Sequence, residues 1–420
     1  MNRRNGRARH TVRPAATFLL TLCVVLLIGV AGMMIARILI SSGTGDENEP
    51  GIMEQVNFHA VPEEIPQEPE EEITESVARY AEELSDEEYR KANNILVWES
   101  NSQDTVTFGF VGDFLLDDEY AIMANLLRRG ATIENGISEA LLAQMRDVDI
   151  LVANNEFPFT DRGTPTEDKT FTFRADTNTV SYLEDMGVDV AVLANNHIYD
   201  FGEVGLLDTL DTLMNAGIPQ VGAGRNLKEA SAPLYFIVND MKIAVVAATQ
   251  IERLDNPDTK GATENSAGVF RCLNPDKLYQ IVADAKEKSD FVIVYIHWGT
   301  ENQTEQDWAQ LDQAPKIAEA GADLIIGDHP HCLQGITYFG DTPVIYSMGN
   351  FWFNSKTLDT GMVKVTIGQQ GLESFQFVPA IQSDCRTDLA YGTDKERILA
   401  YMRGLSPDVQ IDEEGFVSKN

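Results

Sequence analysis

Residues 324–331 read Leu-Ile-Ile-Gly-Asp-His-Pro-His, an apolar run that leads directly into two imidazoles. A short apolar run bounded by Gly and Pro predicts a buried strand, which we expect to end at Gly327. The loop that follows would carry His329 and His331 beyond the end of the sheet. In open α/β sheets, ligands bind in the crevice outside the carboxyl ends of the strands. The stretch therefore predicts an α/β fold with a binding site at this edge.

Further strands are expected to run into polar residues in the same way. They cover residues 105–111, 148–153, 188–194, 291–296 and 344–347. Helical periodicity predicts helices over residues 203–216, 275–288 and 305–320. An antiparallel hairpin is predicted over residues 234–238 and 242–248. The alternation of strands and helices predicts α/β layers with mixed sheets.

The polar residues after these strands form a candidate site. They are Asp113, Asn155, Glu156, Asn195, Asn196, His197, His297, His329, His331 and Asn350. Any one of them alone reads as a turn former or a helix cap. Together they would supply carboxylates, amides and imidazoles to one edge of the sheet, and four of the six histidines of the chain are among them. That mixture suits a borderline or hard divalent ion such as zinc, manganese or iron.

The charge of the chain restricts its partners. A formal net charge of −34 excludes a general nucleic-acid binder, because binding to phosphates depends on Lys and Arg. Divalent cations remain compatible with this charge. An anionic polymer would be repelled unless metal ions bridge the two or basic residues gather locally. The basic residues in segments near the proposed site are Arg128, Arg129, Arg162, Lys169 and Arg174.

The N-terminal segment predicts a membrane anchor. Residues 1–14 contain five arginines and no acid, and an apolar run from Ala15 to Ala36 follows. About 20 apolar residues are enough to cross a bilayer as a helix, and a basic flank stays in the cytoplasm. We therefore expect a single-pass anchor over residues 15–40 in the cell membrane, with a cytoplasmic N-terminus and an extracellular main domain. A cleaved signal peptide is the alternative.

Composition divides the rest of the chain into three parts. Residues 41–103 are rich in Glu and Pro and predict an acidic stalk, since such a segment buries too little apolar surface to offset its ordering entropy. Residues 104–383 contain the strand and helix patterns and predict the folded domain. Residues 384–420 show little periodicity, and we expect a C-terminal tail there.

Six ordered motifs resemble those of the bacterial capsule-synthesis CapA family. They are Gly112-Asp113, Asn155-Glu156, Asn195-Asn196-His197 with Asp200, His297-Trp298-Gly299 with Glu301, His329-Pro330-His331, and Ser347-Met348-Gly349-Asn350. The resemblance implies a layered α/β/β/α sandwich similar to that of the calcineurin-like metallophosphoesterases. It also implies a part in poly-γ-glutamate capsule production, with an anionic polymer as substrate and a membrane-bound polymer synthase as partner.

Carried over residue by residue, the resemblance assigns metal binding to Asp113, Glu156, Asn196, His297, His329 and His331. Glu156 would stand at the bridging position between two metal ions. His197 would act as an acid toward the leaving group, and Asp200 would hold its tautomer. Roles beside the metal ligands or along the substrate are implied for Asn155, Trp298, Glu301 and Asn350.

One motif departs from the phosphoesterase pattern. Where those enzymes have Asp-x-His, this chain has Asp113-Phe114-Leu115, so one imidazole is missing from the first metal site. The number of metal ions and ordinary phosphatase turnover therefore stay open. Three functions remain: an anchored polymer-synthesis protein with a metal-dependent hydrolase-like site, a metal-dependent extracellular phosphoesterase, and a catalytically inactive scaffold for a polymer synthase.

Overall fold

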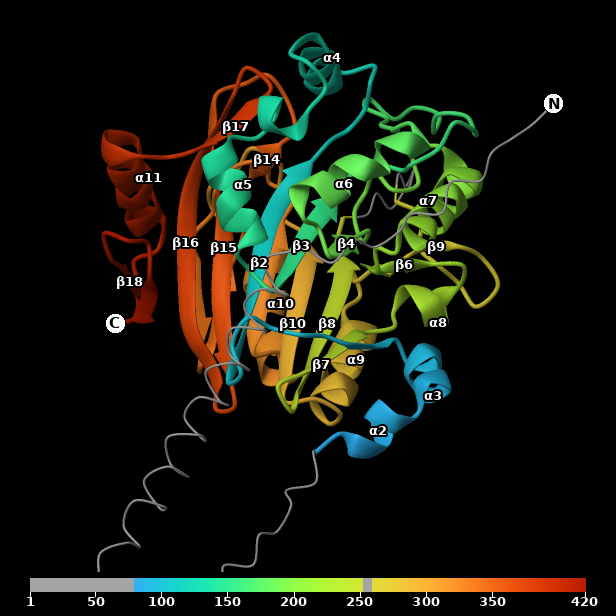
Figure 1. Ribbon diagram of the computed structural model, residues 1–420, viewed down its shortest axis with the longest axis vertical. Helices are drawn as coiled ribbons and strands as arrows, with labels where there is room; N and C mark the ends of the chain where they lie inside the picture. Colours follow the sequence, from blue (N-terminus) through green and yellow to red (C-terminus); the bar gives the residue numbers. More distant parts are fainter. Residues whose placement is uncertain (1–78, 252–258) are drawn as a thin grey trace, which may run out of the picture. The chain divides into compact units, whose positions relative to one another are not determined.

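The computed structural model describes residues 79–251 and 259–420. The predicted cytoplasmic tail, the predicted anchor and most of the predicted stalk lie outside the described residues. Among the helices in the described ranges, none combines the length and the apolar character needed to cross a membrane. The described residues form two sheets and the helices packed on them (Figure 1).

The first sheet has eight strands and a parallel half. Its order is β17-β16-β15-β2-β3-β4-β5, and β14 pairs with the end of β2. The parallel strands are β2 Thr105–Phe114, β3 Ile150–Asn155, β4 Val190–Val192, β5 Gln220–Val221 and the short β14 Asn350–Trp352. The antiparallel strands are β15 Leu358–Gly368, β16 Gly371–Ser383 and β17 Arg386–Leu389.

The second sheet has seven strands in the order β1-β7-β8-β10-β11-β13-β12. Its parallel centre consists of β8 Met241–Thr249, β10 Phe291–His297, β11 Leu324–Asp328 and β13 Thr342–Ile345. The remaining strands are β1 Ile95–Val97, β7 Leu234–Val238 and β12 Ile336–Phe339. The predicted hairpin is confirmed, because β7 pairs antiparallel with β8. Its turn places Asn239 and Asp240 at positive φ, as a type I′ turn requires.

Helices cover both outer faces of the two sheets. On the eight-stranded sheet these are α4 Ala121–Arg128, α5 Glu139–Arg146, α6 Ser181–Met186 and α7 Gly202–Ala216 (Figure 1). On the seven-stranded sheet they are α9 Asp276–Lys286 and α10 Trp308–Glu319. Separate apolar clusters fill the two helix layers, and a third cluster fills the space between the sheets. The prediction of an α/β fold with mixed sheets is confirmed, and the layers follow the order helix, sheet, sheet, helix.

Smaller elements complete the described part of the chain. The short helices are α2 Ala81–Ser85, α3 Glu87–Ala92, α8 Leu227–Ala230, η1 Ile133–Asn135 and η2 Thr177–Val180. Two short antiparallel pairs join β6 Ala223–Gly224 with β9 Gly268–Val269, and β18 Val409–Ile411 with β19 Val417–Lys419.

The folded unit is longer at both ends than the predicted domain of residues 104–383. At the N-terminal side, β1 joins the seven-stranded sheet from within the predicted stalk. At the C-terminal side, residues 384–420 form β17, the helix α11 Gly392–Leu405, β18 and β19. Ile398, Leu399 and Met402 of α11 lie in the apolar cluster between the sheets. These residues therefore belong to the core, although only three residues of α11 are buried and its periodic signal is weak.

Candidate metal centre

Alternation along the strands explains which polar side chains face the space between the sheets. In β3, Ile150 and Val152 lie in the inter-sheet cluster, while Leu151 lies in the outer one. Because side chains of a strand alternate between its faces, Asn154 and then Glu156 continue the inward series. The same alternation in β10 and β11 brings His297 and Asp328 to the inner side. The centre therefore lies at the carboxyl ends of strands from both sheets.

The first carboxylate is part of a strand and not of a loop. The prediction ended this strand before Asp113, but β2 continues to Phe114 because β14 pairs with it there, with Asn350 opposite Asp113. Asn154 and Asn155 are likewise the last residues of β3 and pair with the end of β2. Asp113 is thus fixed by hydrogen-bonded neighbours on both sides, which makes it a rigid ligand position.

Two groups of side chains have a geometry that could hold a metal ion. Glu156, His297 and His329 form one group, and Asp113, Glu156 and His331 form the other. Within each group, the potential ligand atoms lie within 4.8 Å of one another. Glu156 belongs to both groups, which is the arrangement expected of a carboxylate that bridges two cations.

An amide oxygen adds to the group that contains His297. Asn196 Oδ1 lies 2.8 Å from His297 Nε2, and His329 Nδ1 lies 3.0 Å from the same nitrogen. Glu156 Oε1 is 3.4 Å from it. The structure thus brings together all six residues to which metal binding was assigned: Asp113, Glu156, Asn196, His297, His329 and His331.

Several carboxylate oxygens of the centre have no hydrogen-bond partner among the described residues. They are both oxygens of Glu156, Oδ2 of Asp113 and Oδ1 of Asp328, all of them buried. His331 Nδ1 lies 3.1 Å from Asp113 Oδ2, but its hydrogen bond goes to Asn350 Oδ1 at 2.8 Å. Leaving a buried polar atom without a partner costs about 1–3 kcal/mol, and more for a charged group. A bound cation would satisfy these oxygens, so the residues present fit a divalent metal ion.

The electrostatics of the centre favour the same interpretation. Burial, together with the negative charges of Asp113 and Asp328, raises the pKa of Glu156 well above its usual range. Burial and the charge of Asp113 raise the pKa of Asp328 in the same direction. Burial lowers the pKa of His297 to about 3 and that of His329 well below its usual range, which keeps both imidazoles neutral. Metal ligation requires neutral imidazoles, which burial favours at His297 and His329. It also requires ionised carboxylates, and a bound cation would favour that form by offsetting the repulsion between the crowded carboxyl groups.

The loop after β11 adopts backbone conformations that are rare for non-glycine residues. His329 has a φ of 100° and His331 a φ of 56°. Such conformations cost about 1–3 kcal/mol each and are found mainly where function requires them. These backbone conformations on either side of Pro330 allow the two imidazoles to join different ligand groups. His329 joins the group that contains His297, and His331 joins the group that contains Asp113.

His197 lies beside the centre in a buried triad. Its Nδ1 is 2.7 Å from Asp200 Oδ2, and the same oxygen accepts a hydrogen bond from the backbone N–H of Phe173. The ring of Phe173 packs against the imidazole at a centroid distance of 4.2 Å. Lys169 donates to Asp200 Oδ1 at 2.5 Å, with only 6% of its side chain exposed. The predicted pairing of His197 with Asp200 is present, and Lys169 completes it.

Replacement of Lys169 by Met is expected to raise the pKa of His197. Burial lowers this pKa; the charge of Asp200 opposes the shift and the charge of Lys169 adds to it. Removing the ammonium leaves Asp200 as the nearest charge, so the imidazolium becomes easier to form. NMR titration of the imidazole signals of the metal-free protein would measure the change. Lys169→Arg keeps the charge and is the control; a pKa that falls or stays constant in Lys169→Met would contradict this account.

A cavity of about 340 Å³ opens beside the centre. His197, His331 and Asn350 line it together with Glu301, so Glu301 and Asn350 lie where a group bound next to the candidate ligands would reach them, and their predicted roles stay a prediction. Four aromatic side chains form much of its wall: Tyr120, Phe171, Phe173 and Phe353. Among the described residues that line it, Lys356 is the only Lys or Arg. The cavity can therefore accept a largely uncharged group next to the candidate metal ligands.

Two residues predicted to line the substrate lie elsewhere. Trp298 is fully buried in the cluster on the outer face of the seven-stranded sheet, where its Nε1–H donates to the Tyr346 carbonyl at 3.0 Å. It follows His297 directly and so points to the opposite face of the sheet. Asn155 alternates with Asn154 in the same way, and its Nδ2 donates to the Phe157 carbonyl. Neither residue lines the cavity beside the centre.

Sequence reasoning missed two residues of the centre. Asn154 donates from Nδ2 to Asp113 Oδ1 at 2.6 Å and lies 3.2 Å from His297 Nδ1, so it orients one residue of each ligand group. Asp328 accepts a hydrogen bond from the Tyr295 hydroxyl at 3.0 Å. The sequence contains a signal for each of them. The strand period puts Asn154 on the same face as Glu156. For Asp328, the Gly-Asp pair near the end of β2 recurs at the end of β11.

Comparison with known proteins identifies the family. The family described as "Bacterial capsule synthesis protein PGA_cap" matches residues 107–355. The chain belongs to the PGA_cap family. This match includes all of the residues of the candidate metal centre, and the resemblance to CapA proteins is confirmed.

Curated relatives of this PGA_cap member have the following names. "PGA biosynthesis protein CapA" of Bacillus subtilis is 30% identical over 66% of this chain and 72% of its own length. "Capsule biosynthesis protein CapA" of Bacillus anthracis is 32% identical over 55% of this chain and 57% of its own length. A probable polyglutamine synthesis accessory protein of Mycobacterium tuberculosis is 30% identical over 48% of this chain and 55% of its own length. The chain therefore spans little more than half the length of the Bacillus anthracis and Mycobacterium tuberculosis relatives.

Solved structures that resemble this PGA_cap member are distant from it. TT1561 of Thermus thermophilus has a TM-score of 0.35 at 10% identity and covers 64% of this chain and 97% of its own. A 5′-nucleotidase from Candida albicans has the same TM-score and identity, and the match covers 66% of this chain and 52% of the nucleotidase.

Proposed function

We propose that this protein is a membrane-anchored extracellular member of the PGA_cap family that acts in the synthesis or export of poly-γ-glutamate or a related capsular polymer. The names of the Bacillus relatives support the process. The observation that carries a chemical role is the shared position of Glu156 in two candidate ligand groups, with both of its oxygens buried and without partners among the described residues. A merely structural carboxylate would be hydrogen-bonded.

The centre would hold one or two divalent ions such as manganese, zinc or iron. Asp113, Glu156 and His331 would hold one, and Glu156, His297 and His329 with Asn196 the other. When bound, such ions lower the pKa of a water molecule and polarise the scissile group. Asn154 and Asn350 keep the ligands in place, since each hydrogen-bonds to a residue of the centre.

His197 would supply the proton that the leaving group needs. Asp200 engages Nδ1, so Nε2 is the nitrogen left for exchange with a group in the cavity. Lys169 balances the charge of Asp200 inside a buried site. Because of this ion pair, Asp200 keeps a cationic partner when the imidazole of His197 releases its proton. Phe173 packs against the imidazole in a tilted arrangement and restricts its rotation.

The cavity favours an amide over a phosphoester as the group that is cleaved or transferred. Its aromatic walls suit the methylene and amide portions of a γ-glutamyl chain, and Lys356 offers one cation for a carboxylate. A phosphate usually requires several cationic or N–H donors. A metal-dependent extracellular phosphoesterase is the second candidate, supported by the pairing of a two-group centre with His197 and Asp200.

The anchored location rests on the sequence. The apolar run Ala15–Ala36 with its arginine-rich flank supports an inserted helix and an exported domain. In that arrangement the protein would contact membrane-bound components of a polymer synthase, and the anionic polymer would reach the centre outside the cell. Nucleic acid is not an expected partner of a chain with this charge.

The full chain, purified in detergent and loaded with manganese, is expected to release glutamate or shorter oligomers from oligo-γ-glutamate. The double variant His297→Ala/His329→Ala should lose metal and reduce the rate by at least about a hundredfold. Trp308→Ala, which removes an exposed side chain that is not part of the centre, is the control. A chromogenic phosphodiester tests the second candidate in the same preparation.

Cells complete this test. A strain that lacks the protein should regain polymer with the unsubstituted chain and with Trp308→Ala, but not with the double variant. If the double variant restores polymer to the normal level, the catalytic role is wrong and the protein acts as a scaffold.

A further inference from the structure

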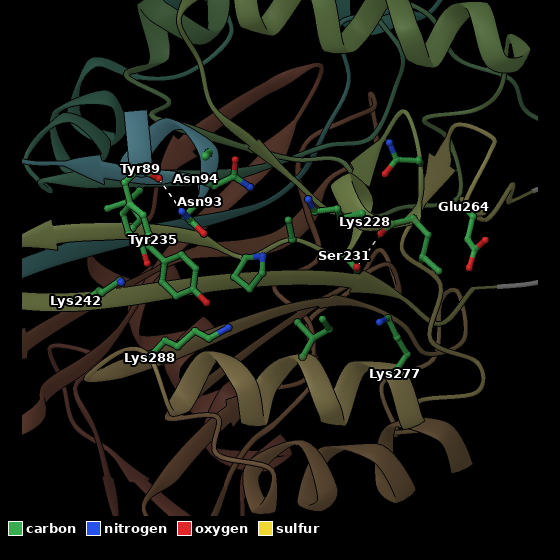
Figure 2. A pocket seen from close by; sticks show the side chains of 17 residues that line it. Tyr89, Asn93, Asn94, Lys228, Ser231, Tyr235, Lys242, Glu264, Lys277 and Lys288 are labelled. Carbon is green, nitrogen blue, oxygen red and sulfur yellow. Dashed lines mark hydrogen bonds between the residues drawn. The ribbon is translucent and has the colours of Figure 1, made fainter. Parts of the chain in front are cut away.

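A second cavity, of about 540 Å³, lies among α3, β1, α8 and α9. It shares no lining residue with the candidate metal centre or with the cavity beside it. Figure 2 shows its side chains at close range, with those of Lys228, Lys242, Lys277 and Lys288 around the opening. We call this cavity the lysine pocket.

The charge of the lysine pocket is opposite to that of the chain. The protein has 66 acidic and 32 basic residues, yet the described residues that line the pocket include four lysines, one glutamate, Glu264, and no aspartate. Lys228 comes from α8, Lys242 from β8, Lys277 from α9, and Lys288 from the residues after α9. Segments distant in sequence thus contribute lysines to the lining of one cavity. In a field that is negative elsewhere, such a site is where an anion would be attracted.

Three of these ammonium groups are free of internal ion pairs. Lys228, Lys277 and Lys288 form no ion pair with any residue in the described ranges. Lys242 differs, because its Nζ lies 2.6 Å from Glu83 and 4.9 Å from the centre of the Tyr235 ring. Lys242 therefore anchors the wall, and the other three remain available to a ligand.

The basic residues near the metal centre contrast with them. Arg129 pairs with Asp384, Arg162 with Asp208, and Lys169 with Asp200. These three cations, which the sequence suggested as partners of an anionic polymer, are therefore already neutralised, whereas Arg128 and Lys356 form no ion pair among the described residues. The lysine pocket supplies unpaired cations instead.

The remaining lining narrows the class of ligand. The lining also contains amide side chains, among them Asn94 and Asn226, and apolar groups such as Ile95 and Ile281. No arginine lines this pocket of the described chain, although arginine is the usual partner of phosphate because its planar fork matches that anion. Lysines, amides and short apolar surfaces together match a flexible chain in which carboxylates are separated by amide and methylene groups.

We infer that the lysine pocket binds a stretch of polycarboxylate chain through Lys228, Lys277 and Lys288, at a distance along the protein surface from the metal centre. The identification of that chain as poly-γ-glutamate rests on the proposed function. A polymer held at a second place stays near the centre at a high effective concentration, even when its contact with the centre is weak. The pocket would thus retain the polymer between successive events at the centre.

Binding of a short fluorescein-labelled oligo-γ-glutamate to the full chain in detergent, followed by fluorescence anisotropy, tests the inference. The triple variant Lys228→Gln/Lys277→Gln/Lys288→Gln should weaken binding about tenfold. The matched control is Lys316→Gln/Lys395→Gln/Lys419→Gln, which removes the same charge at lysines outside the pocket. This control should stay within about twofold of the unsubstituted chain. Melting curves check that both variants remain folded.

The outcomes separate this inference from the proposed function. Absence of binding by the unsubstituted chain, or equal weakening by both triple variants, overturns the pocket. Polyphosphate that competes as well as unlabelled oligo-γ-glutamate also overturns it, because the site would then select charge alone. Loss of binding in the pocket variant supports it even if His297→Ala/His329→Ala proves harmless in cells, and in that case only the catalytic role fails.

Discussion

The substitution Glu156→Gln is expected to stabilise the metal-free protein and to remove most of the stabilisation that metal ions provide. In the metal-free protein, the neutral amide removes a carboxylate that is crowded by Asp113 and Asp328, and the free energy of unfolding should rise by about 1–3 kcal/mol. In excess manganese the unsubstituted protein should gain about 3 kcal/mol at roughly a hundredfold excess over Kd. The variant should gain little, since it lacks the carboxylate common to both ligand groups.

Thermal melting with EDTA and with manganese, together with elemental analysis, measures both effects. Glu413→Gln, an exposed acid near the C-terminus, controls for the loss of one charge and should follow the unsubstituted protein in both conditions. A Glu156→Gln protein that melts lower than the parent in EDTA, or that retains the full metal content, would show that Glu156 is a structural residue.

Gly112→Ala should be among the most destabilising single changes near the centre. A Cβ at this position would lie 2.3 Å from the Gly349 carbonyl oxygen and 2.8 Å from Asp328 Oδ2. The first contact is with backbone, which cannot rotate away, so β14 and β2 must separate at the point where Asp113 is held. We expect a loss of at least about 3 kcal/mol in the free energy of unfolding, together with loss of metal.

Gly404→Ala is the matched control. This glycine lies in α11, and a Cβ added there has no atom within 4 Å among the described residues. The same change of one methyl group should be neutral or stabilise the helix by up to about 1 kcal/mol. Chemical denaturation of both variants tests the comparison. Equal stability of the two variants would mean that the approach of β14 to β2 is looser than the structure shows.

Much of the layered fold follows from periodicity in the sequence. The predicted helices over 203–216, 275–288 and 305–320 correspond to α7, α9 and α10, because each carries one apolar stripe that faces a sheet. The parallel strands were visible as apolar runs, since both of their faces are buried. The assignment of these strands to two separate sheets was not visible, because it depends on long-range pairing that no local pattern encodes.

The limits of sequence reasoning are clearest at the centre. His297, His329 and His331 were found because imidazoles directly after an apolar strand are unusual. Asp328 was passed over, since a carboxylate beside histidines reads as a turn residue, and only its burial and its contact with Tyr295 reveal its role. The predicted position of Trp298 was wrong because all residues of the motif that begins at His297 were expected to face the site. The strand period assigns Trp298 to the opposite face from His297.

The residues of the centre are spread from Asp113 in β2 to Asn350 in β14, with the imidazoles near the end of that interval. A chain is synthesised from its N-terminus, so the first carboxylate exists long before the last histidine. A complete ligand set arises only after the residues that follow β11 have been synthesised, and Asn350 of β14, which contacts His331, comes later still. On the proposed function, uptake of a metal ion would therefore be among the last steps of maturation, and an element that copurifies with the protein would report the compartment in which folding was completed.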